Sequence, residues 1–381
     1  MPFENRSKLA GVEWLSEGCP EVLAERMSSA KVYVLSRDDR MFAFDRAGVP
    51  AAARPSRATI FRAAEQMGAD YVVLGSYEVA DSTFQTSAQL LDVKNLRLDS
   101  PAQAKGPLTE FVNLQTGLAW QLLRQTGHPP PATQQQFVQS SSPVLLDAFE
   151  NYVRGVSAIN RQQKIHYFKE ALRLNPAYAS ASLQLGKAYF DGHEYEQAAT
   201  WLSKVPKEDE SSGEATFLLG MTEYYRGNMD RSYAAFNSLA ARLPLTELYN
   251  NLGVVDARRG RRAAAVEYFS KAATADPSDA DYRFNYGLAL FKDGDSAAAA
   301  RQLREGLQHR PNDVEAKSLL DMINRGVTAP PAVGANAAGS AAIQPGQPRI
   351  PIERIKRNYG ETSYRQLEVE INNLKPQRPP K

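Results

Sequence analysis

Glycine recurs at a nearly constant interval in the second half of the chain, and this spacing constrains the fold more than any other feature. Gly186, Gly220, Gly253 and Gly287 lie 34, 33 and 34 residues apart. Each is followed by a small residue and then a large apolar residue in register, as in Ala265 and Phe269 after Gly253. A repeat of this length is one supersecondary unit that buries its apolar face only by stacking on its neighbours.

Each mark of the repeat has a mechanical reason. The first glycine lets two helices approach where a side chain would separate them. The small residue and the large residue four positions later share one helical face, as a hole and a knob. Proline breaks the second helix before the next repeat begins. A second glycine ends the first helix in a left-handed turn, and these glycines are Gly192, Gly227, Gly260 and Gly294.

The pattern resembles the tetratricopeptide repeat, a helix–turn–helix unit of about 34 residues. The resemblance covers residues 146–325, including a shortened first copy with Gly155 and Phe168. We predict repeats with an end helix over residues 144–326. The resemblance implies an all-α superhelix with a concave groove that holds a peptide or another protein.

In such repeats the first helix of each pair lines the groove. The predicted partner-binding residues are Lys187, Tyr224, Tyr225, Asn250, Arg258 and Lys292. Tyrosine and arginine are frequent energetic anchors at interfaces. We expect Tyr224, Tyr225, Asn250 and Arg258 to be exposed. The competing interpretation is that aromatic residues at these positions pack against the next helix.

Residues 1–127 have a different pattern, which predicts one α/β domain with a mixed sheet. Apolar and β-branched residues predict strands at 31–37, 70–79 and 84–90, and a turn at 93–96 precedes a further strand. Helical spacing appears before, between and after these strands. Residues 40–57 are expected to form a loop, and Arg54, Arg57 and Arg62 are a candidate anion site near the start of the helix that follows.

The stretches PFENRS, EGCPEVLAERM, MGADYVVLGSYEV and AQLLDVKN resemble the amino-terminal domain of the TolB and FlgO type. Members of that family usually lie in the bacterial cell envelope. Pro2–Asn5 match only the end of the family's first strand. Either this strand is three or four residues long, or the true start lies upstream of Met1. The first alternative implies a cytoplasmic protein, and the second, which we favour, leaves room for an export signal to the periplasm or envelope.

Two segments are predicted to be linkers. Residues 128–143 are rich in proline and glutamine and are expected to be extended, and residues 327–348 are expected to be flexible. Residues 349–381 carry eight basic and four acidic side chains. We predict a partly helical tail, interrupted at Gly360, that docks in cis or on a partner. Its predicted apolar stripe is Ile352, Ile355, Tyr364, Leu367 and Ile371.

Composition argues against several function classes. Forty-five basic and 43 acidic residues give no global electrostatic case for nucleic acid or an anionic membrane. The single cysteine, Cys19, and four scattered histidines form no catalytic or metal-binding motif. We therefore expect no enzyme, no cofactor and no metal. The leading function is a non-catalytic adaptor or scaffold. The alternatives are a bacterial envelope-assembly component whose export signal is missing from this chain, and a small-ligand sensor acting through the α/β domain.

Overall fold

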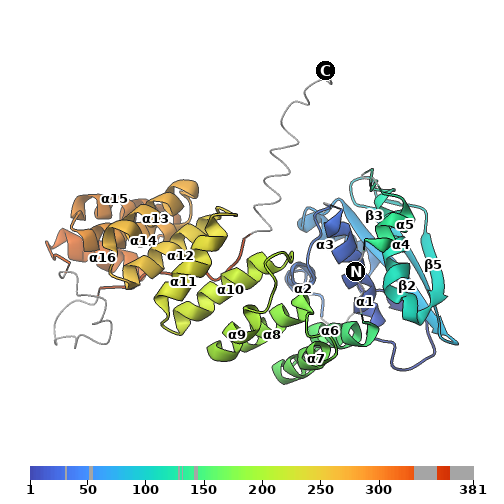
Figure 1. The fold of residues 1–381 in the computed structure, drawn as a ribbon. Coiled ribbons are helices and arrows are strands. Elements are labelled where there is room, and N and C mark those ends of the chain that lie inside the picture. The colour runs from blue at the N-terminus through green and yellow to red at the C-terminus, as the bar shows by residue number, and fades with distance from the viewer. Residues whose placement is uncertain are drawn as a thin grey trace, which may run out of the picture. The chain divides into compact units, whose positions relative to one another are not determined.

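The computed structural model describes residues 1–30, 32–50, 55–127, 129–130, 132–140, 145–329 and 350–360 of the 381-residue chain. The chain divides into two compact units, Met1–Ala181 and Ser182–Lys381. Figure 1 shows strands and helices in the first unit and helices in the second.

The first unit contains a five-stranded mixed sheet. β1 pairs in parallel with β2, and β2 pairs along its whole length with β3 in an antiparallel hairpin. Both β4 and β5 pair with different parts of β3, again antiparallel. The predicted mixed sheet followed by a run of helices is thus confirmed. The strands are β1 Glu4–Asn5, β2 Tyr71–Ala80, β3 Thr83–Asp92, β4 Arg97–Leu98 and β5 Ala102–Pro107.

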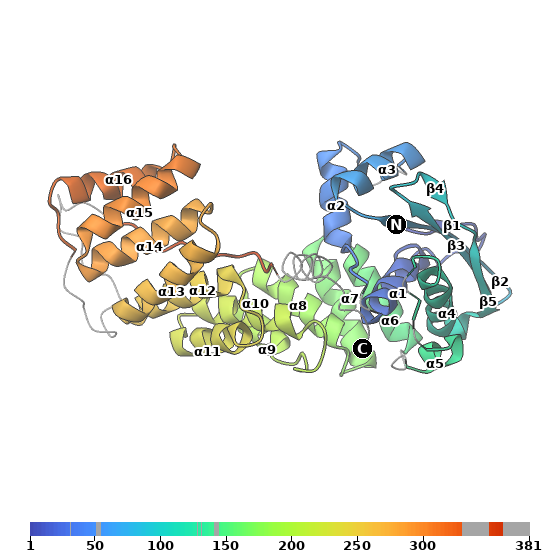
Figure 2. The same cartoon turned by 90° about the horizontal axis from the view of Figure 1, so that it is seen from above.

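Two helices, α1 (Leu15–Ser29) and α4 (Phe111–Leu123), pack together against the sheet (Figure 2). The core between them is aromatic. Phe111 meets Trp14 and Phe84 edge to face, with ring centroids 5.6 and 5.2 Å apart. A 3-10 turn, Leu108–Glu110, leads from β5 into α4.

Two predictions for residues 31–57 are wrong. Residues 32–36 form no strand, and the expected loop contains α2 (Arg37–Arg46). The reason is a capping box. The Asp39 amide donates to Ser36 Oγ over 3.1 Å, and the Ser36 amide donates to Asp39 Oδ2 over 2.9 Å. This pairing satisfies two free amides at a helix start. Helix α3 (Arg57–Gln66) follows with Ser56 as its cap.

The segment expected to be an extended linker is packed in residues 132–140. It contains α5 (Gln134–Gln139), which begins with a second capping box between Thr133 and Gln136. Phe137 of α5 is buried, and the Arg26 guanidinium donates to its carbonyl over 3.0 Å. Side chains of this short helix therefore join the first unit, which the proline and glutamine content did not indicate.

The first helix pair of the repeat pattern also belongs to the first unit. It consists of α6 (Leu146–Ser157) and α7 (Arg161–Leu174). A Cβ atom on Gly155 would lie 2.5 Å from Cε1 of Phe168, so the glycine is needed for the aromatic ring to fit. This is the predicted hole and knob of the shortened first copy.

The second unit continues the helix pairs. Helix α8 crosses the division between the units, and α16 follows the last pair as the predicted end helix. The helices are α8 Ala179–Asp191, α9 Tyr195–Leu202, α10 Ser212–Tyr225, α11 Met229–Ala240, α12 Thr246–Arg258, α13 Arg262–Ala275, α14 Ala280–Asp293, α15 Ser296–His309 and α16 Val314–Asn324.

The first glycine of each repeat faces the knob of its own second helix. An added Cβ on Gly253 would lie 2.7 Å from Phe269, and one on Gly220 would lie 2.6 Å from Phe236. The turn after the first helix is left-handed at three of the four predicted glycines. The exception is the turn after α8, where His193, with φ of 59°, takes the left-handed conformation expected of Gly192.

Candidate partner-binding groove

Residues 350–360 lie in the groove of the second unit in an extended conformation. Figure 2 shows this segment, in red, running beside α14, α12 and α10. We call residues 350–360 the docked segment. The sequence predicted a helix here, but none of these residues is helical. The rest of the predicted apolar stripe, Tyr364, Leu367 and Ile371, lies outside the described residues.

Asn285 of α14 binds the backbone of Arg354 with both ends of its side-chain amide. Its Nδ2 donates to the Arg354 carbonyl over 2.7 Å, and its Oδ1 accepts from the Arg354 amide over 2.8 Å. An extended residue needs both groups paired when it is buried. The asparagine amide thus replaces a neighbouring strand for this residue.

Asn251 of α12 makes the same pair of contacts with Lys356. Its Nδ2 donates to the Lys356 carbonyl, and its Oδ1 accepts from the Lys356 amide, each over 2.8 Å. Asn251 and Asn285 are 34 residues apart, one repeat length. Consecutive repeats therefore hold alternate residues of the docked segment.

Asn250 adds a third amide. It donates to the Arg354 carbonyl over 2.9 Å and accepts from Asn285 Nδ2 over 2.7 Å, so it supports the neighbouring clamp. We expected Asn250 to be exposed, but it is fully buried because the docked segment and Asn285 cover it. All three asparagines are fully buried in the occupied groove.

Four carboxylates at one end of the groove face the cations of the docked segment. We call Asp279, Asp281, Asp313 and Glu315 the acidic cluster. The Arg354 guanidinium forms two hydrogen bonds with Asp313, at 2.6 and 2.8 Å, and lies 3.0 Å from Asp281 and 2.7 Å from Glu315. It also stacks 3.7 Å from the ring centroid of Phe284. This planar, forked geometry is what distinguishes arginine from lysine.

Lys356 uses the other side of the acidic cluster. Its Nζ donates to Asp279 over 2.7 Å and to Asp281 over 2.9 Å. The ammonium also lies 4.9 Å from the ring centroid of Tyr282. Arg354 and Lys356 therefore share Asp281, which ties the two cations to one carboxylate.

The pKa values of these groups record the pairing. Burial acts to raise the pKa of Asp281, but hydrogen bonds from Arg310, Lys356 and Arg354 outweigh it and hold that pKa well below its usual range. The hydrogen bond from Arg354 lowers the pKa of Asp313. For Lys356, burial acts to lower the pKa, but the hydrogen bonds to Asp279 and Asp281 raise it. The charged forms of both sides are thus stabilised together.

Glu353 points to the opposite side of the segment, where three of the predicted residues lie. It is 6% exposed, and Lys292 donates to its carboxylate over 2.6 Å. Tyr224 is hydrogen-bonded to Arg258 and is close enough to Glu353 for that carboxylate to act on its pKa, which burial raises. The predicted residues Tyr224, Arg258 and Lys292 are thus brought together around one acidic side chain. Tyr224 is half-buried and Arg258 is exposed.

The far end of the docked segment meets aromatic rings. Arg357 Nε donates to the Tyr225 hydroxyl over 3.0 Å, and the Tyr359 ring lies 5.3 Å from Phe217. Tyr225 is half-buried and stacks on Tyr195, so it serves both packing and contact with the segment. Lys187, another predicted partner-binding residue, instead forms an ion pair with Glu214 over 2.7 Å.

The sequence interpretation missed the residues that hold the backbone and the cations. Asn251 and Asn285 each lie two positions before the first glycine of their repeat, a recurrence that could have been recognised. The acidic cluster had a weaker signal, because its members come from the start of α14 and from the start of α16. Only the stacking of these helices brings those two ends together.

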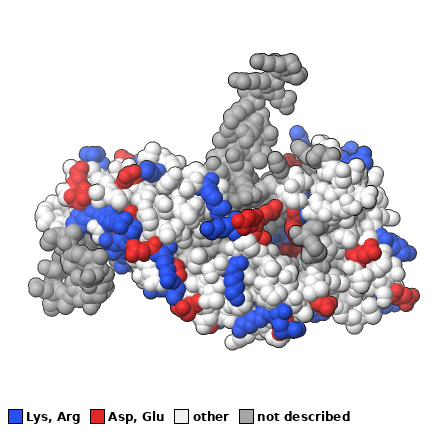
Figure 3. All heavy atoms as spheres, viewed as in Figure 1, with Lys and Arg blue, Asp and Glu red and all other residues white. Residues whose placement is uncertain are grey.

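Charge on the rest of the surface is mixed. On the face drawn in Figure 3, basic and acidic side chains form small separate patches among uncharged ones. The face therefore has no single-sign area large enough to indicate nucleic acid or an anionic membrane. This agrees with the formal net charge of +2.

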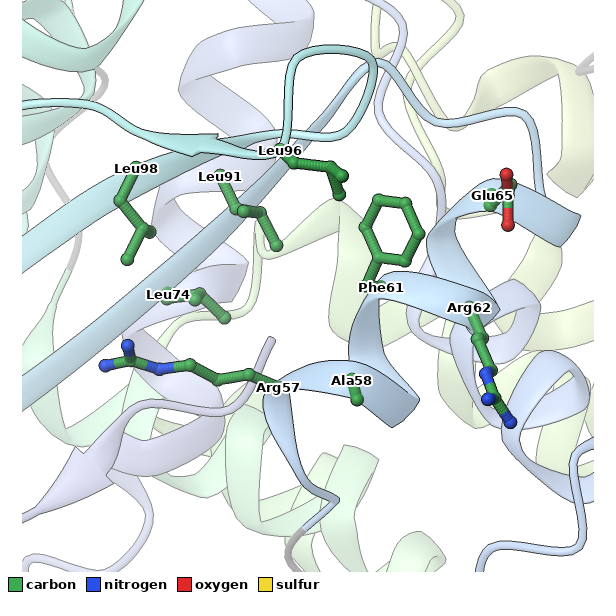
Figure 4. Close-up of a pocket in the computed structure, with 9 residues that line it drawn as sticks. All are labelled: Arg57, Ala58, Phe61, Arg62, Glu65, Leu74, Leu91, Leu96 and Leu98. Carbon is green, nitrogen blue, oxygen red and sulfur yellow. The ribbon is translucent and has the colours of Figure 1, made fainter.

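The first unit has a shallow apolar pocket between α3 and the sheet. It has a volume of about 460 Å³, and its lining includes Phe61, Leu74, Leu91 and Leu98 (Figure 4). Arg57 and Arg62 stand at its rim, but Figure 4 shows their side chains pointing in different directions rather than converging on one point. Arg54, the third member of the candidate anion site, lies outside the described residues.

Within the described ranges, no three histidine, cysteine, aspartate or glutamate side chains are grouped as a metal ion would require. None of the helices in the described part of the chain has the length and apolarity needed to cross a bilayer.

Models of the tetratricopeptide repeat family match residues 165–221 and 250–314. Within these two ranges the helix pairs are tetratricopeptide repeats. The predicted resemblance is confirmed for this part of the chain, whereas no comparison bears on the TolB- and FlgO-like interpretation of residues 1–127. No curated protein matches the chain.

Several solved structures are similar to part of this chain. YrrB, described as a tetratricopeptide-repeat protein with an unusual peptide-binding site, is 19% identical with a TM-score of 0.40, covering 45% of this chain and 88% of its own. A MamA structure is 22% identical with a TM-score of 0.40, covering 44% and 94%. MamA from Desulfovibrio magneticus RS-1 is 21% identical with a TM-score of 0.38, covering 40% and 88%.

Proposed function

We propose that this protein is a non-catalytic adaptor that holds an extended segment of a partner protein in the groove formed by α10, α12, α14 and α16. Tetratricopeptide repeats generally form a protein-binding scaffold, and the second unit contains such repeats. The groove recognises backbone through two asparagine amides and orients the segment through charge.

The observation that carries the proposal is the pair of two-pronged amide contacts made by Asn251 and Asn285. Such contacts do not depend on the side chain of the bound residue, so another extended segment can use them. Free asparagine amides in an apolar groove would be costly. Their recurrence at one repeat length therefore supports a peptide site, beside the contact that Asn250 makes with Asn285 between α12 and α14.

The test uses a labelled peptide, IPIERIKRNYG, with the sequence of residues 350–360. It is titrated against full-length protein in which the docked segment is weakened by Arg354→Glu and Lys356→Glu. We expect saturable binding by fluorescence anisotropy. Adding Asn251→Ala and Asn285→Ala to the same chain should abolish it, while Gln184→Ala, at the equivalent position of α8, should not.

Circular dichroism must first show that each variant is folded. Equal binding with and without the two asparagines would mean that the peptide sits elsewhere. Absence of binding to the weakened chain, at peptide concentrations up to the millimolar range, would overturn the proposed function itself.

A further inference from the structure

We propose that the groove selects partner segments with the pattern Glu-Arg-apolar-Lys, and that residues 353–356 of this chain compete with the partner for the same site. The inference rests on the proposed function, since it names the chemistry of the segment that the groove would hold. The two faces of the docked segment meet different surroundings.

The first face requires two cations two residues apart. Alternate side chains of an extended chain point to the same side, and the spacing between the clamped residues, Arg354 and Lys356, is two. Both reach the acidic cluster, whose carboxylates Asp281 and Asp313 are 19% and 6% exposed in their side chains. Arg310 pairs with Asp281, but one cation does not balance four carboxylates, so this wall of the groove favours a cationic occupant.

Arginine fits the first of these positions better than lysine. The Arg354 fork pairs with both oxygens of Asp313 and at the same time lies over the Phe284 ring. A lysine ammonium is a point charge and cannot make the two parallel hydrogen bonds. Lys356, by contrast, meets single oxygens of Asp279 and Asp281, which suits an ammonium.

The opposite face requires an acidic residue and then an apolar one. Glu353 is buried against Lys292, beside Tyr224 and Arg258. Ile355 packs against the cluster that includes Val254 and Phe269. Ile352 is 60% exposed, so the position before the glutamate is under little constraint. The four residues Glu353–Lys356 therefore carry the charged and apolar contacts of both faces, and Arg357 and Tyr359 add contacts at the far end of the segment.

The chain's own segment has this pattern and fills the site. A tethered ligand acts at an effective concentration in the millimolar range, so it competes with any free segment of the same chemistry. Removing it would take the Arg354 and Lys356 cations from the acidic cluster, where Asp281 would keep its ion pair with Arg310, and would take their backbone groups from the asparagine amides. Exchange for a partner of the same pattern is consequently favoured over an empty groove.

The experiment compares the labelled peptide IPIERIKRNYG on wild-type protein and on the full chain carrying Arg354→Glu and Lys356→Glu. We expect the variant to bind the peptide at least about tenfold more tightly, because its own segment no longer competes. The matched control is Arg301→Glu with Lys317→Glu, which reverses two exposed cations of α15 and α16 and should bind like wild type. Should the double variant be unfolded, Lys356→Glu alone replaces it.

Peptide variants test the selection. Changes equivalent to Glu353→Lys, Arg354→Lys or Lys356→Glu should each weaken binding about tenfold or more, since each removes a charged hydrogen bond. A change equivalent to Ile352→Lys should be neutral. If all peptides bind the weakened chain equally, the selection is wrong although the groove still binds peptides. If wild type and the double variant bind the parent peptide equally, the competition is wrong.

Discussion

The groove helices α12 and α14 and the groove helices α8 and α10 share the same repeat marks but differ in what they present. All four have the first glycine facing a knob from the following helix, at Gly186, Gly220, Gly253 and Gly287. Two positions before the glycine, α12 and α14 carry asparagine, whereas α8 and α10 carry Gln184 and Leu218. The residues that define the repeat thus shape the helix pairs, and side chains at other positions decide where the groove binds a segment.

The aromatic side chains reinforce this difference. Phe190, Tyr195, Tyr224 and Tyr225 form one ring cluster on α8–α10, with Tyr195 and Tyr225 stacked at 5.2 Å. On α14 the rings of Phe284 and Tyr282 instead support the cations of the docked segment. Aromatic residues at groove positions therefore pack mainly against one another on α8–α10, where Tyr225 also contacts Arg357, and contact the segment's cations on α14.

The largest effect is expected from Gly253→Leu, which disrupts the close helix contact that both regions share. The added side chain would overlap Phe269, so we expect a loss of about 3 kcal/mol or more in the free energy of unfolding. Chemical denaturation measures it. Ala263→Leu, at an exposed position of α13, should change the stability by less than about 0.5 kcal/mol. Equal, small changes for both would contradict the close packing at Gly253.

The double substitution Asn251→Ala and Asn285→Ala removes the side-chain amides that distinguish α12 and α14 from α8 and α10. The amides of Arg354 and Lys356 lose their acceptors, so their hydrogen-exchange protection should fall by roughly 10- to 100-fold. Exchange measured by mass spectrometry on the segment's peptides reports this. Gln184→Ala on α8 serves as the comparison and should leave the segment's protection unchanged. Unchanged protection in the asparagine variant would show that charge alone holds the segment.

The pH dependence of peptide binding tests the acidic cluster. The pKa values of Asp281 and Asp313 are lowered from an ordinary 3.8, so their contribution is present above that value and is lost as pH falls below it. The pKa of Lys356 is raised from 10.5, so its contribution is present below 10.5 and is lost at higher pH. We expect constant affinity between pH 5 and 9 in anisotropy titrations, and about tenfold weaker binding near pH 3. A steady decline between pH 5 and 9 would contradict this assignment.

The smallest effect is expected at the junction of the two regions. Tyr225→Phe removes the hydroxyl that accepts from Arg357 but keeps the ring stacked on Tyr195. We expect the labelled peptide to bind about two- to fivefold more weakly, since the contact is exposed to solvent. Tyr195→Phe keeps the same stacking and should leave the affinity unchanged. A loss as large as that of the asparagine variant would place the main binding site on the aromatic cluster instead.

Local pattern was sufficient for much of the architecture. Glycine spacing and the knob at Phe269 predict the helix pairs, because helix contacts within one repeat depend on residues close in the chain. The hairpin of β2 and β3 follows from alternation around a short turn. The same reasoning placed Tyr225, Asn250 and Lys292 on the groove, where each now contacts the docked segment or its clamps. Their role toward a partner protein stays a prediction.

Tertiary structure alone decided what fills the groove. Residues 352–360 have apolar spacing that suits a helix, yet none of them is helical, and Asn251 and Asn285 supply backbone hydrogen bonds to Arg354 and Lys356 that a helix would otherwise make internally. The acidic cluster likewise exists only where α14 and α16 meet. Periodicity in a sequence reports the hydrogen bonds that a segment can make with itself. It cannot report partners that lie about a hundred residues away, and those partners set the conformation here.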